Sequence, residues 1–439
     1  MRLKLPHPLV LLLGGVAVAV LLTWVLPAGQ FERRVDDATG RSVVIPDTYA
    51  RVDPTPVGLM PGLLAVPRGI VEGADVILII LFVGGAFAML ERTGALARLV
   101  GALVGDSPHP WLVVVLVSVV FATLGALENM HEEIIALVPV LLVLSRGLGF
   151  GPLTALAMSL GAAVVAAAFG PTNPFQTGIA LQFAELPPMS QPALRFSLLV
   201  AAVSVWVGWT LVMSAKDERV AGESAIAAEP VQRRDFVLLA LVLLPFVPYV
   251  IGVLRHEWGF NELPALFLVA AFAIGLVSGQ TPSDSAASFI KGMEGMLGAA
   301  LFVGVARGIS VALADGQVLD TILHGLATPL TQVPGVTAAV LMVPMQALLH
   351  IPVPTMSGQA VLTMPVVAPL ADLLGFSRDA SVIAFQTGAG LCDMLTPTNG
   401  ALLAMILSAK ITYGRWLRFA LPGALLVAIV GLIGIVLAG

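Results

Sequence analysis

The same helix-breaking sequence, Pro-Thr-Asn, occurs twice in this chain, each time inside a hydrophobic stretch of membrane-spanning length. The first copy begins at residue 171 and interrupts 153–181; the second begins at 397 and interrupts 380–407. Proline removes a helical hydrogen bond and clashes with the preceding turn, so a helix breaks there. Because lipid cannot satisfy the freed backbone groups, such a break must be buried in protein or line a polar cavity. Paired interrupted segments in two halves of a chain are typical of the binding site of a secondary transporter.

The composition also indicates a membrane protein. Of 439 residues, 58% are hydrophobic and 11% are charged, whereas about a quarter of the residues in a soluble domain are charged. The small net charge of −5 does not point to nucleic acid as a partner. A single cysteine, Cys392, excludes an intramolecular disulfide and a cysteine-based metal site. The apolar stretch 8–26 is too long for the core of a signal peptide, and we expect it to form the first spanning helix.

The two Pro-Thr-Asn copies belong to a longer repeat. Thr398 follows Thr172 by 226 residues, and the same spacing relates Pro365 to Pro139. Each half has a spanning helix (74–90 or 296–313), an amphipathic piece (95–104 or 318–326), two apolar segments around a polar point, and an interrupted segment. The alternative is coincidence in a sequence of low diversity, but the run of matches in register argues against it.

The polar points, 128–133 and 352–359, distinguish two topologies. They are either exposed loops between separate spanning helices or the tips of re-entrant hairpins near the membrane midplane. With hairpins and a cytoplasmic N-terminus, 13 of the 22 Lys and Arg residues fall on the cytoplasmic side, and the short loops obey the positive-inside rule. The hairpin topology also makes the two halves antiparallel, as an inverted repeat requires.

The sequence therefore predicts an all-α polytopic membrane protein, built as an inverted repeat with nine spanning helices, two re-entrant hairpins and two broken helices. The predicted boundaries are a first half at 1–213, with a hairpin at 111–148 and a broken helix at 152–182; a cytoplasmic linker at 214–234; and a second half at 235–439, with a hairpin at 336–374 and a broken helix at 378–408.

The polar side chains at the breaks are candidate ligands of a substrate or a coupling ion: Thr172, Asn173, Thr398 and Asn399. Unwound carbonyls can replace the hydration shell of a cation such as Na⁺, and the N-termini of half-helices can hold a carboxylate. The alternative is that these side chains only satisfy backbone groups that the breaks set free. Gln176 and Thr177, one turn further on, have the same two interpretations.

The hairpin tips supply a second set of candidates for substrate binding. In the second tip, hydroxyls, an amide and a glycine can bind a polar solute without fixed charge; they are Thr355, Ser357, Gly358 and Gln359. The first tip carries an amide, an imidazole and carboxylates, at Asn129, His131, Glu132 and Glu133. Carboxylates that face a cavity can bind a coupling proton, a sodium ion or a cationic substrate. The alternatives are ordinary turn chemistry in the second tip and a solvated charge run in the first.

Two single charges lie within apolar segments. Arg307 is the one charge in 299–313, where a guanidinium needs a partner. It is expected either to hold a substrate carboxylate or to pair with Glu132 or Asp393. Asp393, four residues before the second break, is a further candidate for ion coupling. By contrast, three histidines are expected to cap or anchor helix ends: His109, His324 and His350. No catalytic triad, phosphate loop or His-rich metal spacing occurs in the sequence, so an enzyme is not expected and no cofactor is implied.

Several motifs resemble the YfcC family, which belongs to the C4-dicarboxylate anaerobic carrier group of the ion transporter superfamily. The resemblance rests on 352–365 and 368–372, on the Arg-Gly-Ile-Ser sequence at 307–310, on Glu132 and Glu133, and on 23–29 and 416–419. It implies an inverted-repeat scaffold, two hairpins, a homodimer in the bacterial inner membrane and elevator-type movement of a transport domain. Where a small hydroxyl residue is typical of the second tip, this chain has Met356, which leaves the substrate open.

We therefore expect a secondary active transporter of a small carboxylate-bearing metabolite, a dicarboxylate or an amino acid, coupled to Na⁺ or H⁺ or working as an exchanger. One alternative is a basic amino-acid exchanger of the arginine/ornithine type, which the resemblance also allows. An alternative from another class is a passive channel for small anions. A channel needs a continuous wet path, whereas this chain has discrete polar points separated by apolar segments.

Overall fold

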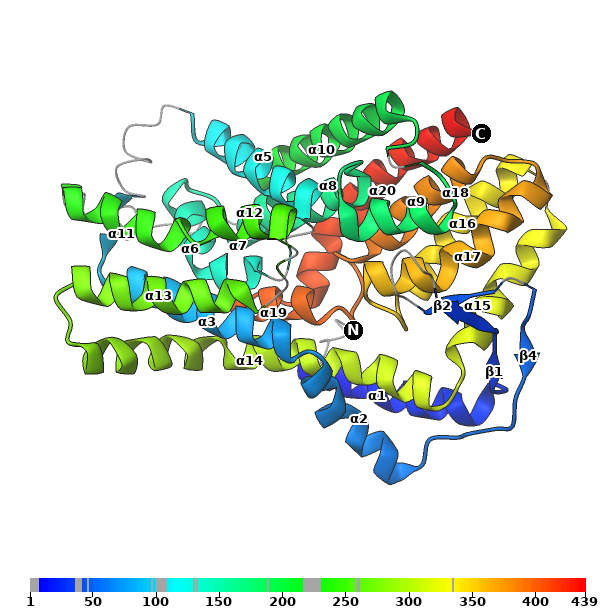
Figure 1. Ribbon diagram of the computed structural model, residues 1–439. Helices are drawn as coiled ribbons and strands as arrows, with labels where there is room; N and C mark the ends of the chain where they lie inside the picture. The colour runs from blue at the N-terminus through cyan, green and yellow to red at the C-terminus, as the bar shows by residue number, and fades with distance from the viewer. Residues whose placement is uncertain are drawn as a thin grey trace, which may run out of the picture.

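A computed structural model describes residues 8–35, 42–45, 47–95, 98–99, 109–128, 131, 133–187, 189–215, 230–256, 258, 261–333 and 335–439. In these residues the chain is mainly helical, with two short strand pairs at one end of the molecule (Figure 1). Seven of the described helices are long and apolar enough to cross a membrane, and four shorter apolar helices accompany them. Such a set of helices is that of a multi-pass membrane protein.

The helices and strands follow one another in the order below. The first half contains α1 (Pro8–Val25), β1 (Gly29–Gln30), β2 (Arg33–Val35), β3 (Ser42–Val44), β4 (Ala50–Arg51), α2 (Leu59–Glu72), α3 (Ala74–Arg92), α5 (Pro110–Glu128), α6 (Ile134–Gly147), α7 (Pro152–Leu156), η1 (Ala157–Gly161), α8 (Ala162–Phe169), η2 (Pro174–Gly178), α9 (Ile179–Phe183) and α10 (Pro192–Ser214). The second contains α11 (Arg233–Leu243), α12 (Phe246–His256), α13 (Glu262–Val277), α14 (Pro282–Asp315), α15 (Leu319–Ala327), η3 (Thr328–Gln332), α16 (Gly335–Leu349), α17 (Met356–Leu374), α18 (Arg378–Phe385), η4 (Gln386–Gly390), α19 (Gly400–Ser408) and α20 (Tyr413–Ala438).

Both predicted broken helices are interrupted at their Pro-Thr-Asn sequences. In the first, α8 ends at Phe169 and the next helical turn, η2, begins at Pro174. In the second, helical structure ends shortly after η4 and α19 begins at Gly400. Each also contains a π-helical turn ahead of its break, η1 in the first and η4 in the second, which the sequence did not predict. Such turns are rare and are found mostly at functional sites.

Long helices differ from the prediction in two places. The predicted helix 296–313 is only part of α14, a continuous helix of 34 residues, about 51 Å long at 1.5 Å per residue. It exceeds the roughly 30 Å hydrocarbon core, so it must tilt or extend beyond it. The segment 28–72, which follows the first predicted helix, contains α2 and the four strands. By length and composition, α5 and α17, predicted as hairpin limbs, could each cross a membrane alone.

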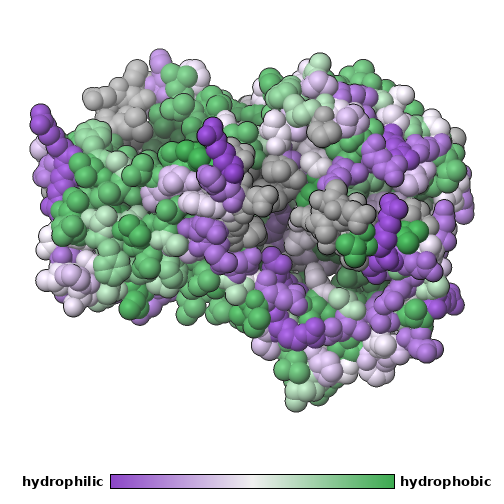
Figure 2. Space-filling model, in the orientation of Figure 1, coloured by the Kyte–Doolittle hydropathy of each residue, from purple (hydrophilic) through white to green (hydrophobic). Residues whose placement is uncertain are grey.

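Apolar side chains cover the outer surface of the helices. The face over α3, α11 and α13 is largely hydrophobic (Figure 2). On α13, Val269 is 70% exposed and Leu276 is 77% exposed, and on α20 Leu425 and Leu437 are also exposed. Soluble monomers rarely expose contiguous apolar patches of more than a few hundred Å². This surface is suited to contact lipid.

Glycines allow α14 to pack closely against α2. A Cβ atom at Gly69 would overlap the backbone nitrogen of Gly308, and one at Gly304 would lie 2.7 Å from the Ile70 side chain. Small residues at a helix interface let two backbones approach, which is a common way for helices to associate in membranes. Since α14 also packs against α1, α3 and α19, it is the central support of this side of the molecule.

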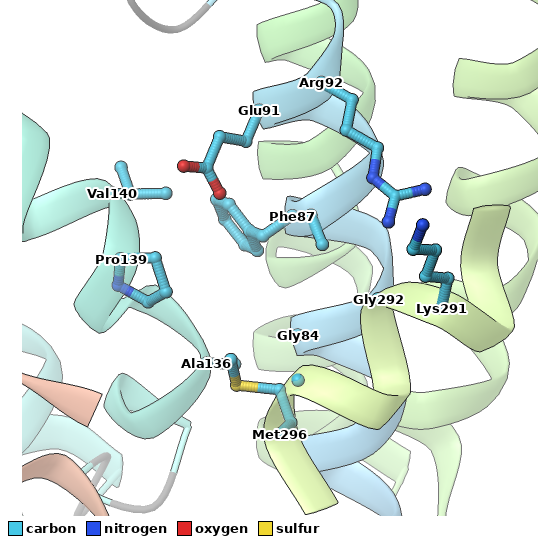
Figure 3. Close-up of a pocket in the computed structure, with 12 residues that line it drawn as sticks. Gly84, Phe87, Glu91, Arg92, Ala136, Pro139, Val140, Lys291, Gly292 and Met296 are labelled. Atoms are coloured by element: carbon cyan, nitrogen blue, oxygen red, sulfur yellow. The ribbon is translucent and has the colours of Figure 1, made fainter. Parts of the chain in front are cut away.

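A crevice separates α3 and α14 from α6 (Figure 3). Its volume is about 240 Å³, and its lining includes Phe87 and Glu91 of α3 and Pro139 and Val140 of α6. Arg92 and Lys291 bring their cationic ends to the same side of the opening, as Figure 3 shows. The crevice therefore marks the boundary between a helix of the predicted hairpin 111–148 and the two long helices beside it.

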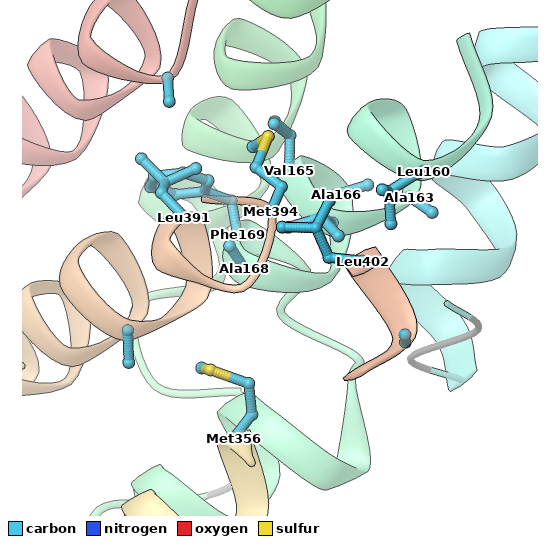
Figure 4. Packing of buried hydrophobic residues seen from close by; sticks show 14 of the residues in the cluster. Leu160, Ala163, Val165, Ala166, Ala168, Phe169, Met356, Leu391, Met394 and Leu402 are labelled. Atoms are coloured by element: carbon cyan, nitrogen blue, oxygen red, sulfur yellow. The ribbon is translucent and has the colours of Figure 1, made fainter. Parts of the chain in front are cut away.

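The largest apolar core surrounds the two broken helices. All eight residues of α8 are buried, and Phe169, Leu391, Met394 and Leu402 gather where the two broken helices meet (Figure 4). A Cβ atom at Gly390 would lie 2.6 Å from the Cβ of Ala168, so the backbones are in close contact there. Asn173 and Thr398 are buried at the breaks, whereas Asn399 is half-buried and Thr172 is exposed. The breaks thus lie against protein and are open to solvent in part, as backbone groups freed from a helix at membrane depth allow.

Ion pairs and rings fix two peripheral segments. The strand region is held to α15, where Arg33 pairs with Asp320 at 2.7 Å and Tyr49 stacks on His324 at 4.1 Å between ring centroids. Most of the predicted amphipathic piece 95–104 and linker 214–234 lies outside the described residues. At their edges, Arg98 and Asp235 form an ion pair at 2.7 Å. The Arg98 guanidinium hydrogen-bonded to Asp235 holds the pKa of that carboxyl below its usual range, although burial opposes the shift.

Candidate functional site

The two break asparagines have the same local role. Asn173 Oδ1 accepts a hydrogen bond from the Gln176 backbone N–H at 2.9 Å, and Asn399 Oδ1 accepts one from Leu402 at 2.9 Å. In each case the donor lies three residues further on, as in a helix N-cap. The asparagines therefore begin the second arm of each broken helix.

The two break threonines also make matching contacts. Thr172 Oγ1 donates to the carbonyl of Ala126, near the end of α5, at 3.3 Å. Thr398 Oγ1 donates to the carbonyl of Ile351, just after α16, at 2.7 Å. Each break is thereby bonded to the end of the first limb of the hairpin predicted in its own half. The threonines thus bond to carbonyl groups of the hairpin limbs rather than to backbone groups that the breaks set free. A role in substrate or ion binding would use their remaining oxygen lone pairs.

The second predicted tip contains a buried chain of hydrogen bonds. Gln359 Nε2 donates to the backbone carbonyl of Gln346 at 2.7 Å and to its side-chain Oε1 at 2.8 Å. Gln359 Oε1 lies 2.8 Å from His350 Nδ1. Gln346 in turn donates to Thr363 Oγ1 at 3.2 Å. The side chains of Gln346, His350 and Gln359 are fully buried.

Asp393 connects this chain to the second break and to the first tip. Its Oδ1 lies 3.1 Å from His350 Nε2 and accepts a hydrogen bond from Asn399 Nδ2 at 2.6 Å. Its Oδ2 lies 3.6 Å from His131 Nδ1. We call Asp393, His131, His350, Gln359 and Asn399 the Asp393 cluster. It joins residues of both halves of the chain around one buried carboxylate.

The other predicted tip residues lie in varied surroundings. Glu133 is buried at the start of α6. Ser357 and Thr355 are half-buried and Gly358 is exposed at the start of α17, where a Cβ atom on Gly358 would lie 2.5 Å from Thr355 Oγ1. Asn129 and Glu132, also predicted as site residues, lie outside the described residues.

Arg307 lies apart from the Asp393 cluster. It is half-buried on α14, and its side chain runs past Gly73, where a Cβ atom would lie 3.3 Å from Arg307 Cδ. The ionic partners of Asp393 are His131 and His350 rather than Arg307. Among the described residues, Arg307 forms no ion pair. One turn on, Ser310 Oγ donates to the carbonyl of Pro352 at 3.2 Å, so α14 touches the second tip.

The sequence reasoning missed a second buried polar network. Arg195, 2% exposed, bonds to Asp379 at 2.7 Å and to Gln386 Oε1 at 2.8 Å. Gln386 Nε2 donates to Thr177 Oγ1 at 2.7 Å, and Thr177 Oγ1 donates to the carbonyl of Gly170 at 2.6 Å. This network ties α10 to both broken helices. The signal was available, since Arg195 is the single charge in the apolar segment 192–214.

Comparisons with known proteins extend over nearly the whole chain. Residues 5–439 match the profile of the DcuC family, described as C4-dicarboxylate anaerobic carrier. A protein of Escherichia coli (strain K12), YfcC, which is described as a candidate basic amino acid antiporter, is 29% identical over 95% of this chain and 93% of its own length. An uncharacterized protein of Haemophilus influenzae (strain ATCC 51907 / DSM 11121 / KW20 / Rd) is 27% identical over the same shares.

Solved structures give weaker likenesses. MtrF of Neisseria gonorrhoeae, from a study of antimetabolite efflux pumps, gives a TM-score of 0.44 at 15% identity, covering 99% of this chain and 95% of its own. The YdaH transporter of Alcanivorax borkumensis gives a TM-score of 0.44 at 18% identity, covering 98% of both chains.

Proposed function

Because the chain belongs to the C4-dicarboxylate anaerobic carrier family, it is a membrane transporter rather than an enzyme, and we propose that it is a secondary active carrier of a small carboxylate-bearing metabolite. The observation that carries the proposal is the Asp393 cluster, which joins a helix break, His131 and Gln359 around one buried carboxylate. Ionisable groups inside a membrane protein are costly and generally mark the pathway of a substrate or an ion. The substrate class is a dicarboxylate or an amino acid.

Candidate substrate contacts are the polar groups at the tips and breaks. They are Asn129, His131, Glu132, Glu133, Thr172, Asn173, Arg307, Thr355, Ser357, Gly358, Gln359, Thr398 and Asn399. Candidate contacts of the coupling ion are Thr172, Asn173, Asp393, Thr398 and Asn399. Arg307 suits a substrate carboxylate because its guanidinium pairs with none of the described carboxylates and offers a bidentate fork. The buried carboxylates of Asp393 and Glu133 favour a second candidate, a basic amino-acid exchanger like that named for the YfcC relative.

Counterflow tests whether the protein is a carrier. We expect purified protein in liposomes preloaded with unlabelled succinate or L-arginine to take up the labelled compound several-fold faster than empty proteoliposomes. A carrier returns loaded faster than it returns empty, whereas a passive channel for small anions shows no such acceleration. The probe is chosen by thermal unfolding, since a ligand at 100 times its dissociation constant stabilises the folded state by about 2.7 kcal/mol. Equal uptake with and without preloading contradicts the proposal.

We further propose that transport follows an elevator mechanism in a homodimer within the bacterial inner membrane, with the N-terminus in the cytoplasm. Segments 111–181 and 336–407 then move as one body, while 74–90 and 296–313 remain in the dimeric scaffold. The crevice between α6 and the pair α3 and α14 supports this division, because it follows the boundary between the two bodies. Gly400 of α19 packs closely against α14, since a Cβ atom on Gly400 would lie 2.5 Å from Val303 Cα. The proposed movement requires α19 to slide along α14 at this contact.

Cysteine pairs across the crevice test the movement. In a Cys392→Ala background, Val140→Cys is combined with Glu91→Cys, which faces it in this structure, or with Leu81→Cys, about 15 Å further along α3. We expect both pairs to crosslink with a short reagent, each inhibiting transport in a different state, and substrate to shift the ratio between them. If only the pair of Val140→Cys and Glu91→Cys crosslinks, and transport continues at full rate, the elevator mechanism is wrong. That result would support local gating by the tips.

A further inference from the structure

Hydrogen-bond directions fix the orientation of the Gln359 amide. Its nitrogen lies 2.7 Å from the backbone carbonyl of Gln346, and a carbonyl can only accept. The amide group therefore directs its NH₂ toward Gln346 and its oxygen toward His350. Both Gln359 and His350 are fully buried, so the protein rather than bulk solvent determines this arrangement.

This orientation in turn fixes a proton on His350. Gln359 Oε1 lies 2.8 Å from His350 Nδ1, so Nδ1 must carry a hydrogen and donate it. A neutral imidazole has only one such hydrogen, which leaves Nε2 bare. Nε2 would then face Asp393 Oδ1 across 3.1 Å with no hydrogen between two acceptors. One additional proton resolves this, either as imidazolium with carboxylate or as imidazole with carboxylic acid.

The same reasoning applies to the other contact of Asp393 Oδ1. Asn399 Oδ1 accepts from the Leu402 backbone N–H, which can only donate, so Asn399 presents its NH₂ to Asp393 at 2.6 Å. Oδ1 thus accepts from an amide on one side and shares a proton with an imidazole on the other. A sodium ion prefers oxygen ligands and would have to displace these N–H donors. The donor set favours a proton over sodium as the occupant.

Resting on the carrier function proposed above, we propose that the Asp393–His350 pair is the proton-coupling site of the transporter. With the proton bound, His350 holds the second tip to the second break. When the proton leaves, His350 Nε2 and Asp393 Oδ1 face each other as two acceptors with no hydrogen between them. They repel each other, and this repulsion separates the second tip from the second break. His131 is the exit and entry group, since it faces Oδ2 at 3.6 Å and its Nε2 has no hydrogen-bond partner within the described residues.

Other titratable groups surround the pair and belong in any test by pH. Glu133 is buried on the α6 side, Cys392 precedes Asp393, and Arg307 lies half-buried on α14, apart from the cluster. Glu132 lies outside the described residues. His350 is in hydrogen-bond contact with both Gln359 of the second tip and Asp393.

The test is proton flux in proteoliposomes that contain an internal pH dye. The probe is whichever of succinate, L-arginine and L-ornithine gives counterflow with the wild-type protein. We expect net wild-type transport to move protons and to continue when Na⁺ is replaced by choline. Asp393→Asn and His350→Gln should lower the number of protons moved per substrate molecule at least tenfold. His109→Gln, at the exposed start of α5, is the matched control and should not change this number.

The outcomes separate the two proposals. If the wild-type protein shows counterflow but its net transport requires Na⁺ and moves no protons, the proton site is wrong. The carrier function is then still supported. Absence of counterflow with every probe overturns both. If a variant does not fold, the proton flux and Na⁺ dependence of the wild-type protein still decide whether a proton or Na⁺ is the coupling ion. If Asp393→Asn keeps full proton flux, another group is the coupling site.

Discussion

Arg195→Leu is expected to lower the free energy of unfolding by about 3–5 kcal/mol, the range for removing one partner of a buried ion pair. Arg195 bonds to Asp379 at 2.7 Å, to Gln386 at 2.8 Å and to the Ser190 carbonyl at 2.8 Å. Without it, the Asp379 carboxylate loses its countercharge and, among the described side chains, keeps the hydrogen bond from the Ser190 hydroxyl. Unfolding of the detergent-solubilised protein, followed by denaturant titration, measures the effect.

Two further variants distinguish the ion pair from the general loss of an arginine. Arg255→Leu removes an exposed arginine at the end of α12 and should change stability by no more than about 0.5 kcal/mol. Arg195→Leu with Asp379→Leu removes both charges and should recover much of the loss, because no uncompensated charge stays buried. If Arg195→Leu is as mild as Arg255→Leu, the network through Gln386 contributes little to holding α10 to the broken helices.

Gly125→Ala is expected to reduce transport more than tenfold in proteoliposomes. A Cβ atom at Gly125 would overlap the carbonyl of Ala163 in α8, which is backbone and cannot rotate away. The carbonyl of Gly125 also accepts from Asn173 Nδ2 at 3.0 Å. Pushing α5 from α8 would therefore break the contact between the first predicted hairpin and the first break. Overpacking of this kind typically costs about 1–3 kcal/mol.

Gly208→Ala is the matched control, because Gly208 lies in α10 with no atom within 4 Å of the added carbon. Alanine favours helix over glycine by about 1 kcal/mol, so this variant should transport normally and unfold no earlier than the wild type. Transport by Gly125→Ala at the wild-type rate would mean that α5 and α8 separate freely during the cycle.

The helix breaks could be predicted because proline acts on its own backbone and on the turn before it. The capping by Asn173 and Asn399 is equally local, and it is one of the two interpretations that the sequence allowed. The same reasoning places both breaks against protein or a polar cavity rather than against lipid. Local rules thus account for where the helices stop.

The partners across the fold could not be predicted in the same way. The sequence predicts a capping or anchoring role for His350, because it directly follows an apolar helix. The structure places it instead against Asp393, 43 residues further on, and no local pattern records a contact over that separation. Arg307 lies half-buried on α14, and Asp393, one of its expected partners, pairs instead with His131 and His350. Arg195 is likewise a single charge in an apolar segment, but its partners Asp379 and Gln386 lie 184 and 191 residues further on.

The π-helical turn Gln386–Gly390 bears on how chains of this family can vary in length. A π turn holds one residue more than an α-helical turn, and the helix on either side continues in its own register. Removing one residue from this turn would restore an α-helix without rotating Asp393 away from His350. Loss of one residue from this turn, outside Gln386 and its contacts to Arg195 and Thr177, is therefore expected to leave the geometry around the Asp393 carboxylate in place.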